Sequence, residues 1–537
     1  MTVEFYTPKV DLQDTDRISA MLDELLAADL RSAEDVEAWL ARESQVRQDI
    51  EDALSVDYIQ FQRFSDQEMY RARFEHNEEV VQPLLKNAKI KLDSKFVSAA
   101  RDHALDSGRY GTLIRRRENA AALFCEANIA LEVQESRLMM KYSELTGAMT
   151  VEWDGVTKTL AEMLPFLEVT DRTVRERAWR TIETAWDAVA HDLGAIMDAL
   201  VPLRHRIAVN AGFANYRDYM FRKLERFDYT PAYCVSLHEA MRSHAAPLLR
   251  RMWQHKAQTL GLARLRPWDV HATPPGNTPL QPFATADELI SRVTRMLARL
   301  DDAFADVLGH MQESGLLDLQ SRPGKVPGGF ESGILATDEA FIFMNAAGVH
   351  WDMTTLVHES GHAVHSRLSG AQELIDFKNV PSESAELASQ GMELLTLDKW
   401  DECYGPTDHQ RAIRHQMSSI VEGLIHIAIV DEFQHWMYEH PTHTNDERLA
   451  KFAELVRSYG QEEVDWAGLE AVMRRNWMPI LHLYEVPFYY IEYGISLLGA
   501  IELWRQYRLD APGTVARFKQ ALTLGAAPTL PEVYAAA

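Results

Sequence analysis

Two histidines and the glutamate between them form the clearest chemical pattern in the sequence. His358-Glu359-Ser360-Gly361-His362 matches H-E-x-x-H, and the apolar residues around it favour a helix. Residues four apart lie on one helix face with Cβ atoms about 5–6 Å apart, so both imidazoles can bind one ion. Zinc suits such ligands, and Glu359 follows the first histidine closely enough to take a proton from water at the ion. The motif predicts one Zn²⁺ per chain held by His358 and His362, with Glu359 as general base.

A catalytic zinc site usually needs a third protein ligand. The spacings of zinc aminopeptidases and thermolysin-like enzymes would place a glutamate at position 381 or 382, where this chain has Pro381 and Ser382. A metzincin spacing also fails, because the required glycine and third histidine are absent. The residues after Pro381 predict a second helix, since proline suits a first turn. Three glutamates on it remain candidates: Glu383, Glu386 and Glu393.

The elements that must position this motif are mostly helices. Apolar residues recur at helical spacing along most of the chain, for example over residues 18–26. Residues 148–157 instead predict a hairpin around an Asp-Gly turn, and residues 334–344 predict a second hairpin just before the motif. We therefore expect a mainly α protein with a small antiparallel β-sheet beside the metal-binding helix. We also expect two domains, an N-terminal helical lobe at 1–200 and a catalytic helical domain at 201–537.

Composition narrows the class of protein. The 537 residues are roughly three to four times a usual domain length and carry a net charge of −25, which argues against nucleic acid as a partner. No run of 18 apolar residues and no signal-peptide pattern occurs, so we expect no membrane association. The cysteines Cys125, Cys234 and Cys403 are far apart and outside any metal or redox motif. We read them as buried thiols in a reducing compartment and place the protein in the cytoplasm.

Several segments together resemble a known family. His358-Glu359-Ser360-Gly361-His362-Ala363-Val364-His365, with Glu386-Leu387-Ala388-Ser389-Gln390 and Glu393, resembles the M3 family of zinc oligopeptidases, most closely its oligoendopeptidase F branch. Further similar segments are residues 324–330, 431–436 and 487–493. The resemblance implies a large helical, two-lobed clamshell with a deep channel that admits short unstructured peptides. It also implies that Glu386 is the third metal ligand.

The same resemblance gives roles to a C-terminal aromatic cluster. On sequence alone such a cluster would be core packing, but in M3 enzymes a histidine and tyrosines from this segment face the scissile bond. Tyr493 and His482 are therefore expected to stabilise the oxyanion. Tyr490 is assigned to the site with them, although the spacing also allows Tyr489. The tyrosine spacing differs a little from the usual family pattern. A second departure is Ser360, which occupies a position where the family usually has a large apolar residue.

The remaining histidines and carboxylates have less specific expectations. His365 is expected to pack beside the metal helix, because two histidines, one glutamate and water already complete a zinc site. Glu393 could orient a histidine ligand by accepting its second N–H. Four further histidines are expected to be structural: His426, His435, His440 and His443.

These patterns together predict a zinc-dependent endopeptidase that hydrolyses internal bonds of short peptides. A metallocarboxypeptidase of similar helical fold is an alternative, although it usually carries another histidine beside the third ligand, where this chain has Ala385. A peptide-binding protein with a catalytically silent metal site is the alternative from outside the enzymes.

Overall fold

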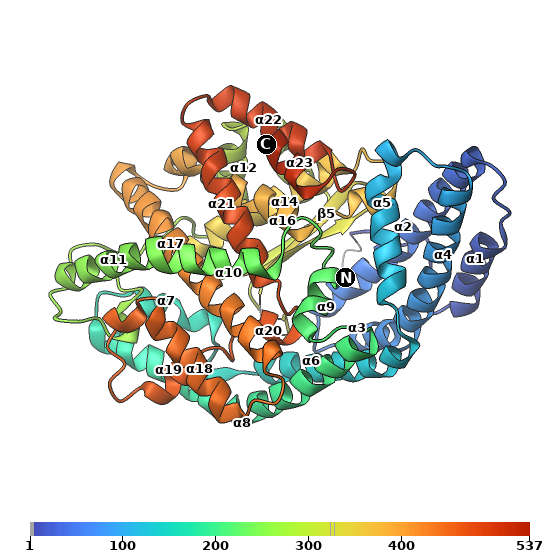
Figure 1. Ribbon diagram of the computed structural model, residues 1–537. Helices are drawn as coiled ribbons and strands as arrows, with labels where there is room; N and C mark the ends of the chain where they lie inside the picture. Colours follow the sequence, from blue (N-terminus) through green and yellow to red (C-terminus); the bar gives the residue numbers. More distant parts are fainter. Residues whose placement is uncertain (1–4, 323, 327) are drawn as a thin grey trace. The chain divides into compact units, whose positions relative to one another are not determined.

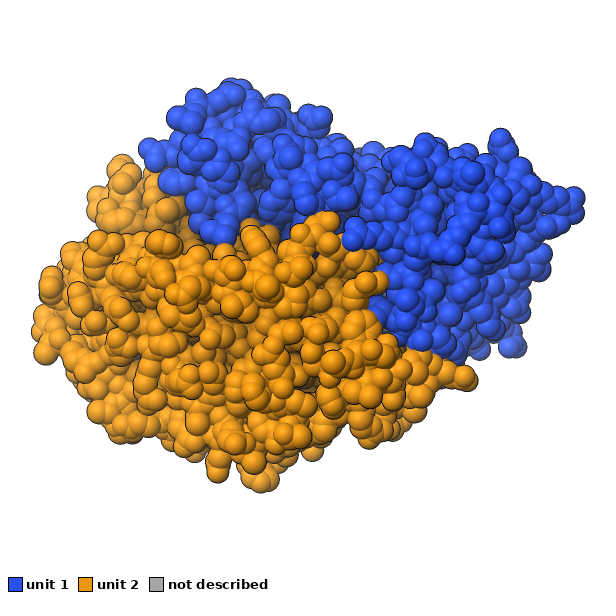
Figure 2. Space-filling model, viewed as in Figure 1, with its two compact units in different colours: residues 1–124, 282–404, 496–537 blue, residues 125–281, 405–495 orange. Residues whose placement is uncertain are grey.

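The computed structural model describes residues 5–322, 324–326 and 328–537, and it is built mainly of helices (Figure 1). The residues form two compact units, coloured separately in Figure 2. Unit 1 consists of residues 1–124, 282–404 and 496–537, and unit 2 of residues 125–281 and 405–495. The predicted helical class is correct. The expected division into domains at 1–200 and 201–537 is a different kind of statement from this grouping by compactness, and it stays a prediction.

Unit 1 holds the metal-site motif and most of the N-terminal helices. Its elements are α1 (Thr15–Ala27), α2 (Ala33–Arg63), α3 (Glu68–His76), η1 (Asn77–Val81), α4 (Gln82–Asp102), α5 (Ser107–Leu123), α12 (Ala286–Ala298), α13 (Asp302–Glu313), β3 (Leu317–Gln320), β4 (Phe330–Ile334), β5 (Glu339–Ala346), α14 (His350–Ser369), α15 (Ile375–Lys378), α16 (Ser382–Leu395), η6 (Leu397–Glu402), α22 (Ala511–Thr523) and α23 (Leu530–Ala536). The H-E-x-x-H motif lies on α14, as predicted.

Unit 2 is also helical, apart from one hairpin. Its elements are η2 (Glu126–Asn128), α6 (Ile129–Gly147), β1 (Thr150–Trp153), β2 (Val156–Thr159), η3 (Ala161–Met163), α7 (Pro165–Glu168), α8 (Arg172–Asn210), α9 (Tyr216–Lys223), α10 (Pro231–Ala240), η4 (Met241–Ala245), α11 (Ala246–Thr259), η5 (Pro267–Asp269), α17 (Pro406–Glu439), α18 (Asn445–Ser458), η7 (Gln461–Glu463), α19 (Glu470–Arg475) and α20 (Leu481–Glu485). Helix α21 (Tyr490–Tyr507) begins in unit 2 and ends in unit 1.

Both predicted hairpins form. Strands β1 and β2 pair antiparallel around Asp154 and Gly155, which take left-handed backbone conformations (φ 51° and 80°) that suit the Asp-Gly turn. Strands β4 and β5 pair antiparallel next to α14, with Phe330 opposite Phe343 and Ile334 opposite Glu339.

The second sheet differs from the prediction, because it has a third strand and is mixed. Its order is β3-β5-β4, and β3 runs parallel to β5. The apolar run of β5 is buried at the centre of the sheet, whereas β3 is short and carries Asp318. This carboxylate is held by Arg63, Arg322 and Lys325 at 2.7–2.9 Å. Arg63 comes from a distant part of the sequence, and β3 pairs with β5 rather than with the strand that follows it, so no local hairpin signal marked β3 as a strand.

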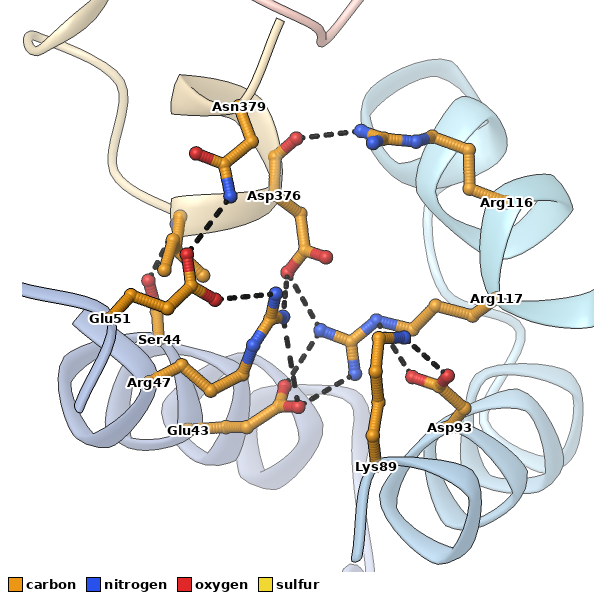
Figure 3. A network of polar contacts seen from close by, with 11 residues as sticks. Glu43, Ser44, Arg47, Glu51, Lys89, Asp93, Arg116, Arg117, Asp376 and Asn379 are labelled. Carbon is orange, nitrogen blue, oxygen red and sulfur yellow. Dashed lines mark hydrogen bonds and ion pairs between the residues drawn. The ribbon is translucent and has the colours of Figure 1, made fainter. Parts of the chain in front are cut away.

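The N-terminal helices hold the segment that joins the two motif helices of unit 1. Asp376 on α15 accepts hydrogen bonds from Arg47 on α2 (2.9 Å) and Arg117 on α5 (2.8 Å), and Arg117 also pairs with Glu43 (2.7 Å), as Figure 3 shows. Although burial alone would raise it, the two guanidinium groups hold the pKa of Asp376 well below its ordinary value. The backbone N–H of Ile375 donates to Ser44 on α2 at 2.6 Å. Helix α15, between α14 and α16, is therefore anchored on α2 and α5.

Candidate metal centre

Helix α14, which carries the H-E-x-x-H motif, begins at a defined cap. The Asp352 carboxylate accepts three backbone N–H groups, from Ala347, Gly348 and Val349, at 2.7–2.9 Å. These donors would otherwise be unsatisfied at a helix N-terminus. Gly348 takes a positive φ of 89°, which lets the chain turn from β5 into the helix. The cap fixes where α14 starts and therefore which residues face α16.

Helices α14 and α16 approach closely at a glycine inside the motif. A Cβ on Gly361 would lie 2.6 Å from Ser389 Cα and 2.7 Å from the Ala388 carbonyl oxygen on α16. A side chain at this position would force the two helices apart. Helix α16 starts at Ser382 with Pro381 as its cap, one residue after the predicted first-turn position. The close approach brings α16 alongside the two histidines of α14.

The three expected ligands converge. One ligand atom each from His358, His362 and Glu386 lies within 4.8 Å of the other two. Glu386 Oε2 is 3.4 Å from His358 Nε2 and 4.0 Å from His362 Nε2. Among the residues that the structure describes, this cluster takes in Glu386 and not Glu383. Two imidazoles and one carboxylate around an open position form a donor set that fits a catalytic zinc ion.

Glu393 fixes the orientation of one of these imidazoles. His358 Nδ1 lies 2.7 Å from Glu393 Oε1, two turns along α16 from Glu386. A carboxylate at Nδ1 favours the tautomer that leaves the Nε2 lone pair free for a metal ion. Burial alone would lower the pKa of His358, but Glu386 and Glu393 raise it well above its ordinary value. The two carboxylates thus favour a positive charge at this point, which a bound cation would supply in place of the proton.

His362, the second histidine of the cluster, and Glu359, the expected base, have contrasting environments. Burial lowers the pKa of His362 to about 4, so its ring is neutral and able to coordinate. Glu359 is also buried, and burial raises its pKa to about 7, with further contributions from the charges of Glu386 and Glu331. A carboxyl group whose pKa lies near neutrality can both accept and return a proton.

Glu331 is a carboxylate near this site that sequence reasoning missed. It lies on β4, accepts a hydrogen bond from Ser366 on α14 at 2.8 Å, and contributes to the raised pKa of Glu359. Burial raises the pKa of Glu331 itself to about 7. Nothing in the local sequence marks it, because it reaches α14 only through the packing of the sheet on that helix.

Two other residues of α14 have packing roles. Ser360, where the family usually has a large apolar residue, donates to the Leu356 carbonyl at 2.6 Å, so its buried hydroxyl is satisfied within the helix. His365 is buried, and burial lowers its pKa to about 3, so the ring is neutral. It is not part of the ligand cluster formed by described residues, in keeping with the expected packing role.

The aromatic residues expected at the site form a cluster of their own in unit 2. His482 Nε2 lies 3.2 Å from the Tyr493 hydroxyl, and the His482 ring packs against Tyr490 (5.0 Å) and Tyr489 (5.7 Å). Burial raises the pKa of Tyr490 to about 12, so its phenol stays protonated. Arg204 on α8 donates to the Leu483 carbonyl at 3.0 Å and also to that of Tyr484, which holds α20 and with it His482.

Comparison with known proteins assigns the family. The model of peptidase family M3 matches residues 166–537, well over half of the chain. The chain belongs to peptidase family M3.

Curated relatives of this M3 chain include two bacterial oligopeptidases. It is 22% identical over 356 residues to Group B oligopeptidase PepB of Streptococcus agalactiae serotype III (strain NEM316), covering 65% of this chain and 57% of the relative. It is 23% identical over 340 residues to the chromosomal oligoendopeptidase F of Lactococcus lactis subsp. cremoris, covering 62% and 54%. The matched segments thus span little more than half of the length of these relatives.

A solved structure extends the likeness of the M3 chain to its whole length. The structure of PZ peptidase A with an inhibitor superposes with a TM-score of 0.93 at 24% identity, covering 99% of this chain and 95% of that one. The shared fold therefore includes the N-terminal helices, which precede the segment matched by the family. In the described part of the chain, no helix has the length and apolar character needed to cross a membrane.

Proposed function

We propose that this M3 chain is a zinc-dependent endopeptidase that hydrolyses internal bonds of short peptides. The observation that carries the proposal is the convergence of His358, His362 and Glu386 within 4.8 Å, on the helix that also carries Glu359. In this assignment the three residues hold one catalytic zinc ion. When bound, zinc would polarise the scissile carbonyl and lower the pKa of a water molecule towards about 7.

The residues of the chain supply orientation and proton transfer. Glu393 accepts a hydrogen bond from His358 Nδ1, which leaves the Nε2 lone pair free to hold the metal when it is bound. Glu359 removes a proton from the attacking water and then delivers it to the leaving amine. Its pKa of about 7 suits both steps, because the group can change protonation at neutral pH. No covalent intermediate is needed.

We assign oxyanion stabilisation to Tyr493 and His482. Their 3.2 Å contact holds the two donors together, and Tyr490 packs at 5.7 Å from the Tyr493 ring. A donor of this kind typically contributes about 3–4 kcal/mol to stabilising the transition state. Tyr490 is proposed as the neighbour that accompanies Tyr493, with Tyr489 at 5.1 Å from Tyr493 as the other candidate.

Short extended peptides are the proposed substrates. Strand β4 is an edge strand of the three-stranded sheet next to α14. An extended peptide can add to such an edge through main-chain hydrogen bonds, which tolerate many side chains. The cytoplasm is the proposed location, and the free thiols of all three cysteines support a reducing compartment.

Internally quenched peptides blocked at both ends test the function. We expect cleavage at internal bonds, mapped by mass spectrometry, that stops with a chelator and returns with Zn²⁺. A metallocarboxypeptidase would instead need a free C-terminus and would leave the blocked peptides intact. A silent peptide-binding protein would bind them without any zinc-dependent product, and either result would refute the proposal.

A further inference from the structure

A second group of metal-ligand side chains lies wholly within unit 2, on α10 and α17. Cys234 and His238 are four residues apart on α10, and Asp431 and His435 are four residues apart on α17. Each pair therefore shares one helix face. One ligand atom each from Cys234, Asp431 and His435 lies within 4.8 Å of the other two. We propose that these three residues bind a second transition-metal ion of the zinc class.

The polar atoms of this cluster are buried and incompletely satisfied. Cys234 and Asp431 are fully buried and His435 is 4% exposed. Within the described chain, Asp431 Oδ1 and both ring nitrogens of His435 lack a hydrogen-bond partner, and His435 Nε2 lies 3.4 Å from Asp431 Oδ2. Leaving buried polar groups unpaired is costly. A cation between them would satisfy both side chains at once.

His238 supports the carboxylate from outside the ligand set. Its Nε2 lies 2.7 Å from Asp431 Oδ2, and its ring packs edge-on against that of His435 at 5.5 Å. Hydrogen bonds of this kind orient metal-binding carboxylates. Phe221 and Phe488 pack against the other sides of the His435 ring, at 6.2 and 5.6 Å. The cluster is therefore closed by an imidazole and aromatic rings.

Metal binding at the cluster involves the loss of one proton. Cysteine coordinates a metal ion as the thiolate, so an ion that binds here displaces the proton of the Cys234 thiol. The ion then meets the thiolate, the Asp431 carboxylate and the His435 ring, which come from two helices.

The donor chemistry selects the class of metal. A thiolate, an imidazole and a carboxylate suit Zn²⁺ and similar transition metals, whereas Ca²⁺ and Mg²⁺ require oxygen ligands throughout. Zinc at about 2.0–2.3 Å from each ligand draws the donor atoms to within about 4 Å of one another. Small side-chain rotations would complete the site. The ion bridges α10 and α17, which already pack together.

Cobalt substitution tests this site separately from the catalytic one. Apoprotein of the full chain is titrated with Co²⁺ alone and followed by absorbance. Only a site with a cysteine ligand gives the near-ultraviolet thiolate-to-cobalt charge-transfer band, and the residues of the catalytic cluster contain no sulfur. We expect wild-type protein to bind two Co²⁺ ions per chain. The intensity of the band at saturation should correspond to one of the two ions having a thiolate ligand. Glu386→Gln should keep the band.

Matched variants decide whether the band comes from this cysteine. Cys234→Ser should abolish it, whereas Cys403→Ser, which changes a buried thiol of unit 1, should leave it intact. His435→Gln keeps the thiol and should weaken Co²⁺ binding at least tenfold, as judged from the band. A wild-type protein that saturates with Co²⁺ and shows no band overturns the proposal, even if every variant fails to fold. A band that survives in Cys234→Ser, or an unchanged affinity in His435→Gln, also overturns it.

Discussion

The cluster on α14 and α16 (His358, His362, Glu386) and the cluster on α10 and α17 (Cys234, Asp431, His435) share the same helical spacing but differ in their surroundings. In unit 1, His358 and His362 lie four residues apart on α14, and Glu386 comes from the neighbouring helix α16. The side chains of His358 and His362 are 21% and 16% exposed. In unit 2, the corresponding groups are almost completely buried. The first cluster has Glu359 directly after its first histidine, with a raised pKa. The same position in the second is Glu432, which is paired with Arg242 and Tyr459.

The difference separates the proposed catalytic site from the proposed second metal site. Four-residue spacing on a helix places two side chains on one face, and each cluster combines such a pair with a residue from a neighbouring helix. Catalysis also needs an open position for water and substrate and a base free to move a proton. The α14–α16 cluster is partly exposed and has Glu359 beside it, in keeping with the proposed catalytic role, whereas the α10–α17 cluster is almost completely buried.

Removing the third ligand should have the largest effect on the first cluster. Glu386→Ala leaves two imidazoles without their carboxylate, so we expect zinc content to fall below stoichiometric levels and peptide cleavage to fall below detection. The measurements are metal analysis after dialysis and the quenched-peptide assay. Glu383→Ala, on the same helix, is the matched control and should keep both metal and activity. Loss of metal in Glu383→Ala instead would mean that the assigned glutamate is wrong.

Changing the residue that follows the first ligand tests where the base lies. Glu359→Gln keeps all three metal ligands but cannot accept a proton, so we expect zinc to be retained and kcat to fall by about 10²–10⁴-fold. Glu432→Gln is the equivalent change in unit 2, and we expect it to leave kcat unchanged. Near-normal turnover in Glu359→Gln would rule out its role as general base.

The aromatic cluster of unit 2 tests whether its donors act on the reaction. Tyr493→Phe removes one hydroxyl and keeps the ring, so we expect kcat to fall by about 10²-fold with little change in zinc content. The check is a comparison of kcat, KM and metal analysis with those of Tyr489→Phe. A larger loss in Tyr489→Phe would reverse the assignment of the two rings.

The orienting carboxylate should have a smaller effect on metal binding. Glu393→Gln keeps a hydrogen-bond acceptor at His358 Nδ1 but loses the charge, so we expect zinc affinity to fall by up to about 10–100-fold. Competition with a chromogenic chelator gives this affinity. Glu313→Gln, an exposed glutamate of α13, provides the control. An unchanged affinity in Glu393→Gln would make the 2.7 Å contact irrelevant to binding.

The smallest expected effect is the dependence of stability on pH that His365 causes. In the described chain both ring nitrogens of His365 lack a hydrogen-bond partner, whereas His238 and His435 contact the Asp431 carboxylate. Burial lowers the pKa of His365 from 6.5 to about 3. Below pH 6.5 the unfolded chain therefore binds a proton that the folded chain refuses, and the free energy of unfolding falls as pH falls. Between pH 6.5 and 5 we expect His365 to contribute roughly 1–2 kcal/mol of this loss.

Urea unfolding at both pH values measures this loss. His365→Phe should reduce the decrease, whereas His191→Gln, at an exposed position, should not. An equal decrease in wild type and His365→Phe would contradict the assignment.

Local patterns in the sequence predicted the elements that carry the first cluster. The periodicity around His358, the helix after Pro381 and the hairpin ending in β5 all depend on neighbouring residues, and the structure contains each of them. The choice among three glutamates was different, because it depends on how α14 meets α16. That contact is set at Gly361, whose role is visible only in the packing.

Non-local contacts account for what the sequence did not reveal. The parallel pairing of β3, the approach of Glu331 to α14 and the contact between Cys234 and Asp431 each join residues from separate segments. His435 was expected to be structural, although Asp431 stands four residues before it on the same helix. That spacing indicates that Asp431 and His435 share one face of a helix. Nothing in the sequence shows that Cys234, on α10, packs against that face.

The anchoring of α15 has a consequence for fragments of this protein. The segment matched by the family starts at residue 166 and contains every residue assigned to catalysis. A shortened chain beginning there would lack Arg47 and Arg117, leaving Asp376 without its counter-charges, and would strip the apolar cover from Leu374 and Phe377. Since breaking a buried ion pair costs about 3–5 kcal/mol, a chain shortened to the segment that the family matches would lose the anchoring of α15, the helix between α14 and α16.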